Sequence, residues 1–192
     1  MVFLLLLGVN LTAQTAPLSK EAQQALAKKY PALRVQAKVG IMRKPVPGSF
    51  YLKTMTMTPE IVIESAPTQP MSAGSASFVL ITMDTEEKYR RSEQMCKVAT
   101  NETLPIPEVQ KGSRRKFEFA GMKSQFDGDR DASNVGGDVY KYYMMAVFAD
   151  DKQFLHFETN CPALEKHLAA HPEERLKYLG LQPGTKFTTK FP

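Results

Sequence analysis

Alternating and continuous apolar segments along the chain predict several antiparallel strands. Residues 50–57 (FYLKTMTM) alternate in polarity, as a strand with one buried face does. Residues 77–83 (SFVLITM) are almost continuously apolar, which favours a central strand buried on both faces. Shorter strands are expected at residues 61–63 and around Phe117 and Phe119. Residues 139–149 and 154–159 are separated by a polar turn and are predicted to form a long hairpin.

Capping residues and helical spacing predict helices in three regions. Ser19 can cap an N-terminal helix that ends or bends at Pro31. Asp84 can cap a middle helix, with Glu87 completing a capping box. The apolar face of this middle helix would carry Tyr89, Met95, Cys96 and Ala99. At the C-terminal end, one helix is expected to begin at Pro162, with Leu164 and Leu168 facing inward. A second helix is expected after Pro172, with Leu176 and Leu179 facing inward, and Gly180 is expected to end it.

This order of elements predicts an α+β fold. A mainly antiparallel sheet would carry the N-terminal, middle and C-terminal helices packed on it as a layer sandwich. Between Phe50 and Leu181, the order strand, helix, long hairpin and helix resembles the Mog1/PsbP-like family. That resemblance implies a small αβα domain of a kind that is often exported and mostly non-catalytic. It is carried by element order alone, and no functional residue follows from it.

The first residues are typical of an export signal. Residues 2–9 (VFLLLLGV) form an uncharged apolar run that small residues follow, as in a secretory signal peptide. We expect the signal to occupy residues 1–16, with cleavage after Ala13, and the mature protein to be secreted or periplasmic. The run is too short to span about 30 Å of hydrocarbon, so no transmembrane span is expected. The first basic residue is Lys20, which leaves a buried N-terminal strand or helix as the alternative.

Length and charge refine this picture. The chain has 192 residues, 43% of them hydrophobic, which favours one globular domain. We assign residues 49–192 to that domain and residues 17–48 to a basic helical arm and connector. Between residues 20 and 53 there are eight Lys or Arg residues, and Glu21 is the single acidic one. Long-range attraction could therefore bring an acidic protein, lipid or glycan to four basic residues of this region: Lys28, Lys29, Arg43 and Lys44. An ordinary solvated face is the simpler alternative, and export argues against nucleic acid as a partner.

The two cysteines of the chain, Cys96 and Cys161, are 65 positions apart. An even number of cysteines in an exported protein predicts a disulfide, and two free buried thiols are the alternative. A redox site is not expected, because the sequence contains no C-x-x-C motif.

Three patterns could bind metal ions. Asp127, Asp129, Asp131 and Asp138 occupy positions 1, 3, 5 and 12 of an EF-hand-like calcium loop. Ala132 stands where that loop needs Gly, however, and the flanking segments are predicted strands, so a solvated hairpin loop is the alternative. Met55 and Met57 could bind Cu(I) through their thioethers, or pack in the core. His167 and His171 have the spacing of two imidazoles on one helix face, but Pro172 disfavours that geometry.

Signatures of catalysis are missing from the sequence. It contains no G-x-S-x-G, S-x-x-K, P-loop or G-x-G-x-x-G motif. We therefore expect an exported, soluble, non-catalytic domain that binds a protein, an envelope surface or a small ligand, without a cofactor. Two alternatives stay open: a protein that binds calcium or copper at the positions above, and a hydrolase that uses dispersed carboxylates.

Overall fold

A computed structural model describes residues 32–86, 88, 94–129 and 136–188 of the chain. Nine strands run through these residues: β1 (Leu33–Pro45), β2 (Leu52–Ser65), β3 (Gly74–Asp84), β4 (Met95–Ile106), β5 (Arg114–Glu118), β6 (Met122–Asp127), β7 (Asp138–Ala149), β8 (Phe154–Thr159) and β9 (Lys186–Thr188). Two short helices, α3 (Pro162–Ala170) and α4 (Arg175–Leu179), follow β8, and a 3-10 turn, η1 (Pro172–Glu174), joins them.

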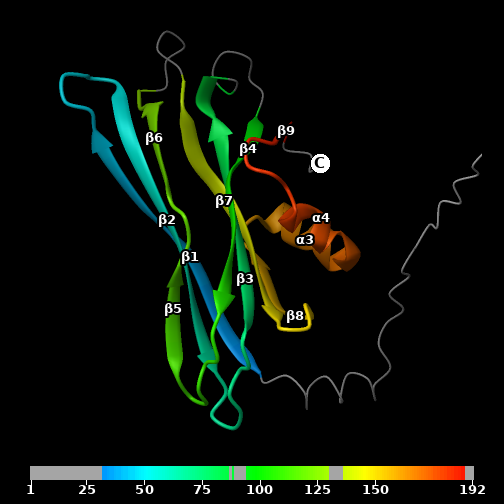
Figure 1. Cartoon of the computed structure of the whole chain (residues 1–192). Helices are drawn as coiled ribbons and strands as arrows, with labels where there is room; N and C mark the ends of the chain where they lie inside the picture. The colour runs from blue at the N-terminus through cyan, green and yellow to red at the C-terminus, as the bar shows by residue number, and fades with distance from the viewer. Residues whose placement is uncertain (1–31, 87, 89–93, 130–135, 189–192) are drawn as a thin grey trace, which may run out of the picture.

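The strands form two antiparallel sheets. In the four-stranded sheet, β2 is central: β1 pairs along one side of it, and β5 and β6 pair consecutively along the other. The five-stranded sheet has the order β8-β7-β3-β4-β9. Figure 1 shows the two long, twisted sheets side by side, with the helices on the outer side of the five-stranded sheet.

Apolar side chains pack both between the sheets and beneath the helices. One cluster joins Ile61 and Ile63 of β2 to Phe78 of β3 and to Tyr143 and Met145 of β7. A second cluster lies on the opposite face of the five-stranded sheet, where Val79 and Ile81 of β3 pack with residues of α3 and α4 that include Leu164, Leu168 and Tyr178. The central part of β3 is therefore buried on both faces, as its continuous apolar run predicts.

A proline in the central strand β2 is accommodated by a break in the neighbouring strands. Pro59 is buried, and its carbonyl oxygen accepts a hydrogen bond from the Phe119 N–H at 3.0 Å. β5 ends at Glu118 and β6 begins at Met122, so the proline lies opposite the gap between them. Because proline has no N–H to donate, this break allows β2 to continue as one strand. The two strands that we expected at residues 50–57 and 61–63 are thus one.

The predicted hairpin and the C-terminal helices are confirmed. β7 and β8 pair directly, with Ala146 opposite Phe157. α3 has Pro162 in its first turn, and its buried residues are Leu164 and Leu168. α4 buries Leu179, and Gly180 is its C-cap residue. Leu176, which we expected to face inward, is instead 61% exposed.

The predicted fold class is wrong. Instead of one sheet covered by N-terminal, middle and C-terminal helices, the described residues form two facing sheets, and the helices packed on them are the C-terminal pair. The physical reason is that β2 buries its apolar face, with Ile61 and Ile63, against the second sheet rather than against helices.

Two further expectations are corrected at the level of single elements. Residues 33–45, expected to belong to a helical arm and connector, form β1 and pair along its whole length with β2. The helix from Ser19 to Pro31 lies outside the described residues. Asp84 does cap a helical turn, its Oδ1 accepting the Glu86 N–H at 2.9 Å, but Met95, Cys96 and Ala99 belong to β4. β6 and β9 were not predicted.

Candidate functional site

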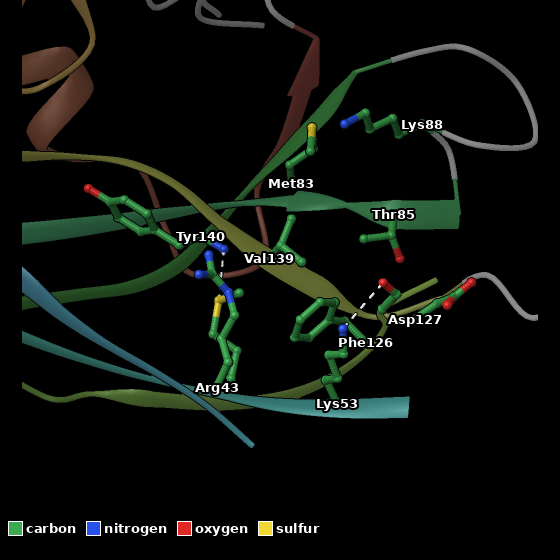
Figure 2. A pocket seen from close by; sticks show the side chains of 11 residues that line it. Arg43, Lys53, Met83, Thr85, Lys88, Phe126, Asp127, Val139 and Tyr140 are labelled. Carbon is green, nitrogen blue, oxygen red and sulfur yellow. Dashed lines mark hydrogen bonds between the residues drawn. The ribbon is translucent and has the colours of Figure 1, made fainter. Parts of the chain in front are cut away.

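A pocket of about 330 Å³ opens between the two sheets, at the end of the molecule where β6 ends and β7 begins. Arg43 of β1 and Lys53 of β2 approach it from the four-stranded sheet, and Figure 2 shows them across the pocket from Met83, Val139 and Tyr140 of the five-stranded sheet. The remaining lining residues come from β2, the β6 end and the helical turn after β3: Met55, Thr85, Lys88, Phe126, Asp127 and Gly128. The volume is at the lower end of the range for small-molecule sites.

The strand register places two basic side chains on the inner face of the four-stranded sheet. Arg43 lies directly opposite Met55, which is buried, and Lys53 lies directly opposite Phe126, which is also buried. Side chains of directly opposed residues in an antiparallel pair point to the same face of the sheet. Arg43, which is exposed, and Lys53, which is half-buried, therefore lie on the inner-face side of the sheet, at the pocket.

Neither of these cations has a carboxylate partner among the described residues. Arg43 forms no ion pair or hydrogen bond there, and Lys53 Nζ lies 3.5 Å from the carbonyl oxygen of Gly128. Two lysines on the outer face of the same sheet, Lys38 and Lys116, differ in this respect. Lys38 and Lys116 lie 2.9 and 2.8 Å from the carboxylate oxygens of Glu60, and these contacts hold the pKa of Glu60 below its usual value. The inward-facing cations thus keep their capacity to bind an anion.

One carboxylate, Asp127, also lines the pocket. Its side chain is buried, with the residue 2% exposed, and its Oδ1 accepts the Asp129 N–H at 3.0 Å. Its Oδ2 is buried without a hydrogen-bond donor from the described residues. Next to it, the Thr85 Oγ1 lies 2.6 and 3.0 Å from the carbonyl oxygens of Gly136 and Gly137, which joins the end of β3 to the start of β7.

The floor of the pocket is apolar. Met55 and Phe126 pack there with Val139 and Tyr140 in a core cluster, and the Tyr140 N–H donates to the Met55 Sδ at 3.3 Å. Burial raises the pKa of Tyr140, so its hydroxyl is neutral at ordinary pH. That hydroxyl accepts a hydrogen bond from the Asn160 Nδ2 at 2.7 Å. Chemically, the pocket combines a cationic rim with an apolar floor, an arrangement suited to binding an organic anion.

The structure does not assemble the predicted calcium loop from the residues that it describes. Asp138 forms an ion pair with Lys97, Asp127 is buried, and Asp129 is exposed. Asp131 lies outside the described residues. Within those residues, no three His, Cys, Asp or Glu side chains are grouped so that they could hold a metal ion.

The residues of the other two predicted metal sites have ordinary structural roles. Met55 and Met57 are both buried in the core cluster between the sheets, where apolar packing accounts for them. His167 and His171 do lie close together, with their ring centroids 4.9 Å apart. His167 Nε2 lies 2.9 Å from Glu174 Oε2, and His171 Nδ1 lies 3.5 Å from Glu173 Oε1, so carboxylates of η1 already contact both rings.

The two cysteines contact the same apolar cluster under the C-terminal helices. Cys96 of β4 is buried in the cluster under the helices, and Cys161, the N-cap residue of α3, packs against the same cluster. Both are free thiols in the structure. Burial raises the pKa of Cys96. The predicted disulfide therefore stays a prediction.

The basic residues proposed from sequence separate in space. Arg43 lines the pocket and Lys44, its neighbour on β1, is exposed on the other face of the strand, whereas Lys28 and Lys29 lie outside the described residues. Lys53, Phe126 and Thr85 were not singled out as site residues. The alternation of residues 33–41 (LRVQAKVGI) could have revealed β1, and with it the inward direction of Arg43, but the pairing with β2 that builds the pocket has no local signal.

Comparisons with known proteins leave the family of the chain open. No protein family and no curated protein matches the sequence. Among solved structures, the chain is similar to a protein from Akkermansia muciniphila, with 14% identity over 78% of this chain and 76% of that one, at a TM-score of 0.38. It is also similar to the structural genomics target SoR45, with 10% identity over 67% and 85% of the two chains, at a TM-score of 0.27. In the part of the chain that the structure describes, no helix has the length and apolar character needed to cross a membrane.

Proposed function

We propose that the protein is an exported binding domain whose ligand is a small organic anion held in the pocket between the two sheets. The anionic group would bind Arg43 and Lys53, and the apolar body of the ligand would contact Met55 and Phe126. The observation that carries this proposal is the direction of the two cations. They lie on the inner-face side of the four-stranded sheet, and no carboxylate oxygen of the described residues lies within ion-pair distance of either.

Electrostatics explains why such an arrangement favours binding over stability. Two like charges that line one pocket repel each other, so they do not stabilise the folded state unless an anion joins them. A bound carboxylate or phosphate would accept charge-assisted hydrogen bonds from both side chains, and Arg would bind it in a bidentate fashion. Of the remaining lining, Met55, Phe126 and Val139 contribute apolar contact area, whereas the Asp127 carboxylate would repel an anion placed beside it.

The proposal is tested by ligand-dependent thermal unfolding of the purified protein. Octanoate and octyl phosphate serve as anionic probes, and octanol serves as their neutral counterpart. A ligand that binds only the folded state stabilises it by RT ln(1 + [L]/Kd), so a probe at about one hundred times its Kd adds about 2.7 kcal/mol. We expect the anionic probes to raise the melting temperature, octanol to raise it less, and added salt to reduce the effect.

Matched variants locate the binding. The double variant R43Q/K53Q should lose the probe-dependent shift, whereas K123Q should keep it, because Lys123 is exposed on the outer face of β6. Without a ligand, R43Q/K53Q should be at least as stable as the parent protein, since it removes two unpaired cations. A probe-dependent shift that persists in R43Q/K53Q, or an equal shift with octanol, would show that the pocket is not an anion site.

A further inference from the structure

The turn between β1 and β2 carries an unusual concentration of exposed apolar side chains. We call residues 41–53 the hairpin tip. Among the described residues, four large apolar side chains are well exposed, and three of them lie in the hairpin tip: Ile41 (37%), Met42 (50%) and Phe50 (104%). The fourth is Leu176, on α4. Because Ile41 and Met42 are neighbours on a strand, they point to opposite faces of the hairpin, so each face of the tip carries an exposed apolar side chain.

The same segment is basic and has no acidic residue. Arg43, Lys44 and Lys53 lie in the hairpin tip, and the sequence has no Asp or Glu between Glu21 and Glu60. Lys44 forms no ion pair or hydrogen bond with the described residues. This contrasts with the middle of the same sheet, where Glu60 pairs with Lys38 and Lys116. Apolar side chains flanked by unpaired cations therefore distinguish the tip from the rest of the sheet.

Hydrogen bonds hold the turn in a defined shape. The Val46 N–H donates to the Leu52 carbonyl oxygen at 3.0 Å, and the Leu52 N–H donates to the Ser49 Oγ at 3.0 Å. Gly48 supplies the positive φ, 79°, that the turn requires. The Gly128 N–H donates to the Tyr51 carbonyl oxygen at 2.8 Å, which anchors the turn to the end of β6. Phe50 is thus presented to solvent by a hydrogen-bonded turn. The turn between β1 and β2 forms the end of the cyan hairpin in Figure 1.

From these observations we infer that the hairpin tip docks on the surface of an anionic phospholipid bilayer. A fluid bilayer accepts a protruding ring such as Phe50 without a preformed hole, and aromatic side chains favour the interface between hydrocarbon and water. Lys44, which is exposed on the outer face of β1, is attracted to anionic headgroups and strengthens binding about fivefold. An acidic protein would satisfy the cations, but it would need a matching cavity for apolar groups that point in two directions.

The test is co-sedimentation of the purified protein with vesicles of phosphatidylcholine alone or mixed with phosphatidylglycerol. We expect binding to the mixed vesicles that weakens at high salt. M42S/F50S should reduce the partition coefficient by at least about tenfold, because it removes two apolar side chains from the contact. K44Q should reduce it about fivefold. The matched controls L176S and K166Q, which change exposed residues of α4 and α3, should bind like the parent protein.

A fluorescent variant tests insertion directly. The chain contains no tryptophan, so F50W introduces a single indole at the tip. Its emission should shift to the blue with phosphatidylglycerol vesicles, and in L176W it should not. No shift in F50W, or vesicle binding that M42S/F50S leaves unchanged, would overturn the inference.

The inference is independent of the pocket ligand. The tip variants leave Arg43 and Lys53 in place, so M42S/F50S should keep the octanoate-dependent thermal shift while it loses vesicle binding. Failure of the anion probes would therefore leave the membrane test intact, and the reverse also holds.

Discussion

A single amide side chain joins the C-terminal helices to the five-stranded sheet. The Asn101 Nδ2 of β4 donates to the carbonyl oxygens of Leu179 and Leu181, at 2.7 and 2.8 Å. These carbonyls lie at and just beyond the end of α4, where a helix has no backbone donors left for its last carbonyls. N101A should therefore loosen α4, although Tyr178 and Leu179 would still pack in the cluster beneath it.

The expected magnitude follows from the two hydrogen bonds. Each contributes about 0.5–1.5 kcal/mol net, so N101A should lower the free energy of unfolding by roughly 1–3 kcal/mol. For a chain of this size, that corresponds to a fall in melting temperature of roughly 2–12 °C. N101D should cost at least as much at neutral pH, because it places a carboxylate oxygen against two carbonyl oxygens. At low pH it should recover relative to N101A, since a protonated carboxyl can donate one hydrogen bond.

Thermal and urea unfolding would measure these differences, and hydrogen exchange of residues 176–182 would show whether the loss is local. Q125A is the matched control, because Gln125 is an exposed amide on β6 whose side chain has no partner among the described residues. The prediction would be contradicted if N101A and N101D were both as stable as Q125A and if the amides of residues 176–182 exchanged no faster. The two hydrogen bonds of Asn101 would then contribute nothing measurable to the free energy of unfolding.

Four further predictions concern the thiols, a glycine, pH and export. After proteolysis, protein purified from an oxidising compartment should yield two peptides joined by a Cys96–Cys161 disulfide. C161S should then lower the free energy of unfolding by about 4 kcal/mol. Full alkylation of both thiols without a reductant would contradict this prediction. G74A should destabilise the fold by about 1–3 kcal/mol, because its Cβ would lie 2.1 Å from the Phe148 carbonyl oxygen. G40A, whose Cβ would meet the rotatable Thr58 Oγ1, should cost less in the same unfolding assay. The contacts of Glu60 with Lys116 and Lys38 lower its pKa from 4.5. The ionised form of Glu60 therefore stabilises the protein above pH 4.5, and that stabilisation is lost as the pH falls through the lowered pKa. In a plot of stability against pH, E60Q should show a shallower fall at acidic pH, and an unchanged fall would contradict a role for these contacts. Mass spectrometry of the exported protein should find Gln14 at its N-terminus, whereas an intact Met1 would contradict cleavage after Ala13.

Part of the fold follows from local patterns in the sequence. The continuous apolar run of β3 could only be buried on two faces, and the turn between two apolar segments predicts the β7–β8 hairpin. Proline in the first turn and Gly180 at the end predict the bounds of the C-terminal helices. These elements were predictable because the signal for each lies within a few neighbouring residues.

Two errors came from segments whose local pattern has two explanations. Met95, Cys96 and Ala99 have a spacing that a helix face also shows, yet β4 gains its stability from pairing with β3 and β9. In β1, Gly40 and Pro45 suggest a connector, whereas thirteen residues pair with β2. Pairing with a distant strand decided both cases, and a sequence window contains no information on such a partner.

The candidate sites depend even more on tertiary structure. Composition and charge by themselves showed that the region around residues 20–53 is basic. The direction of each cation was decided by strand register, since a shift of one residue would turn Arg43 outward and Lys44 inward. The second sheet then supplies Tyr140 and Val139 to close the pocket from the other side. Local sequence therefore determined the charge and much of the secondary structure, whereas the packing of two sheets determined where that charge faces and what it can bind.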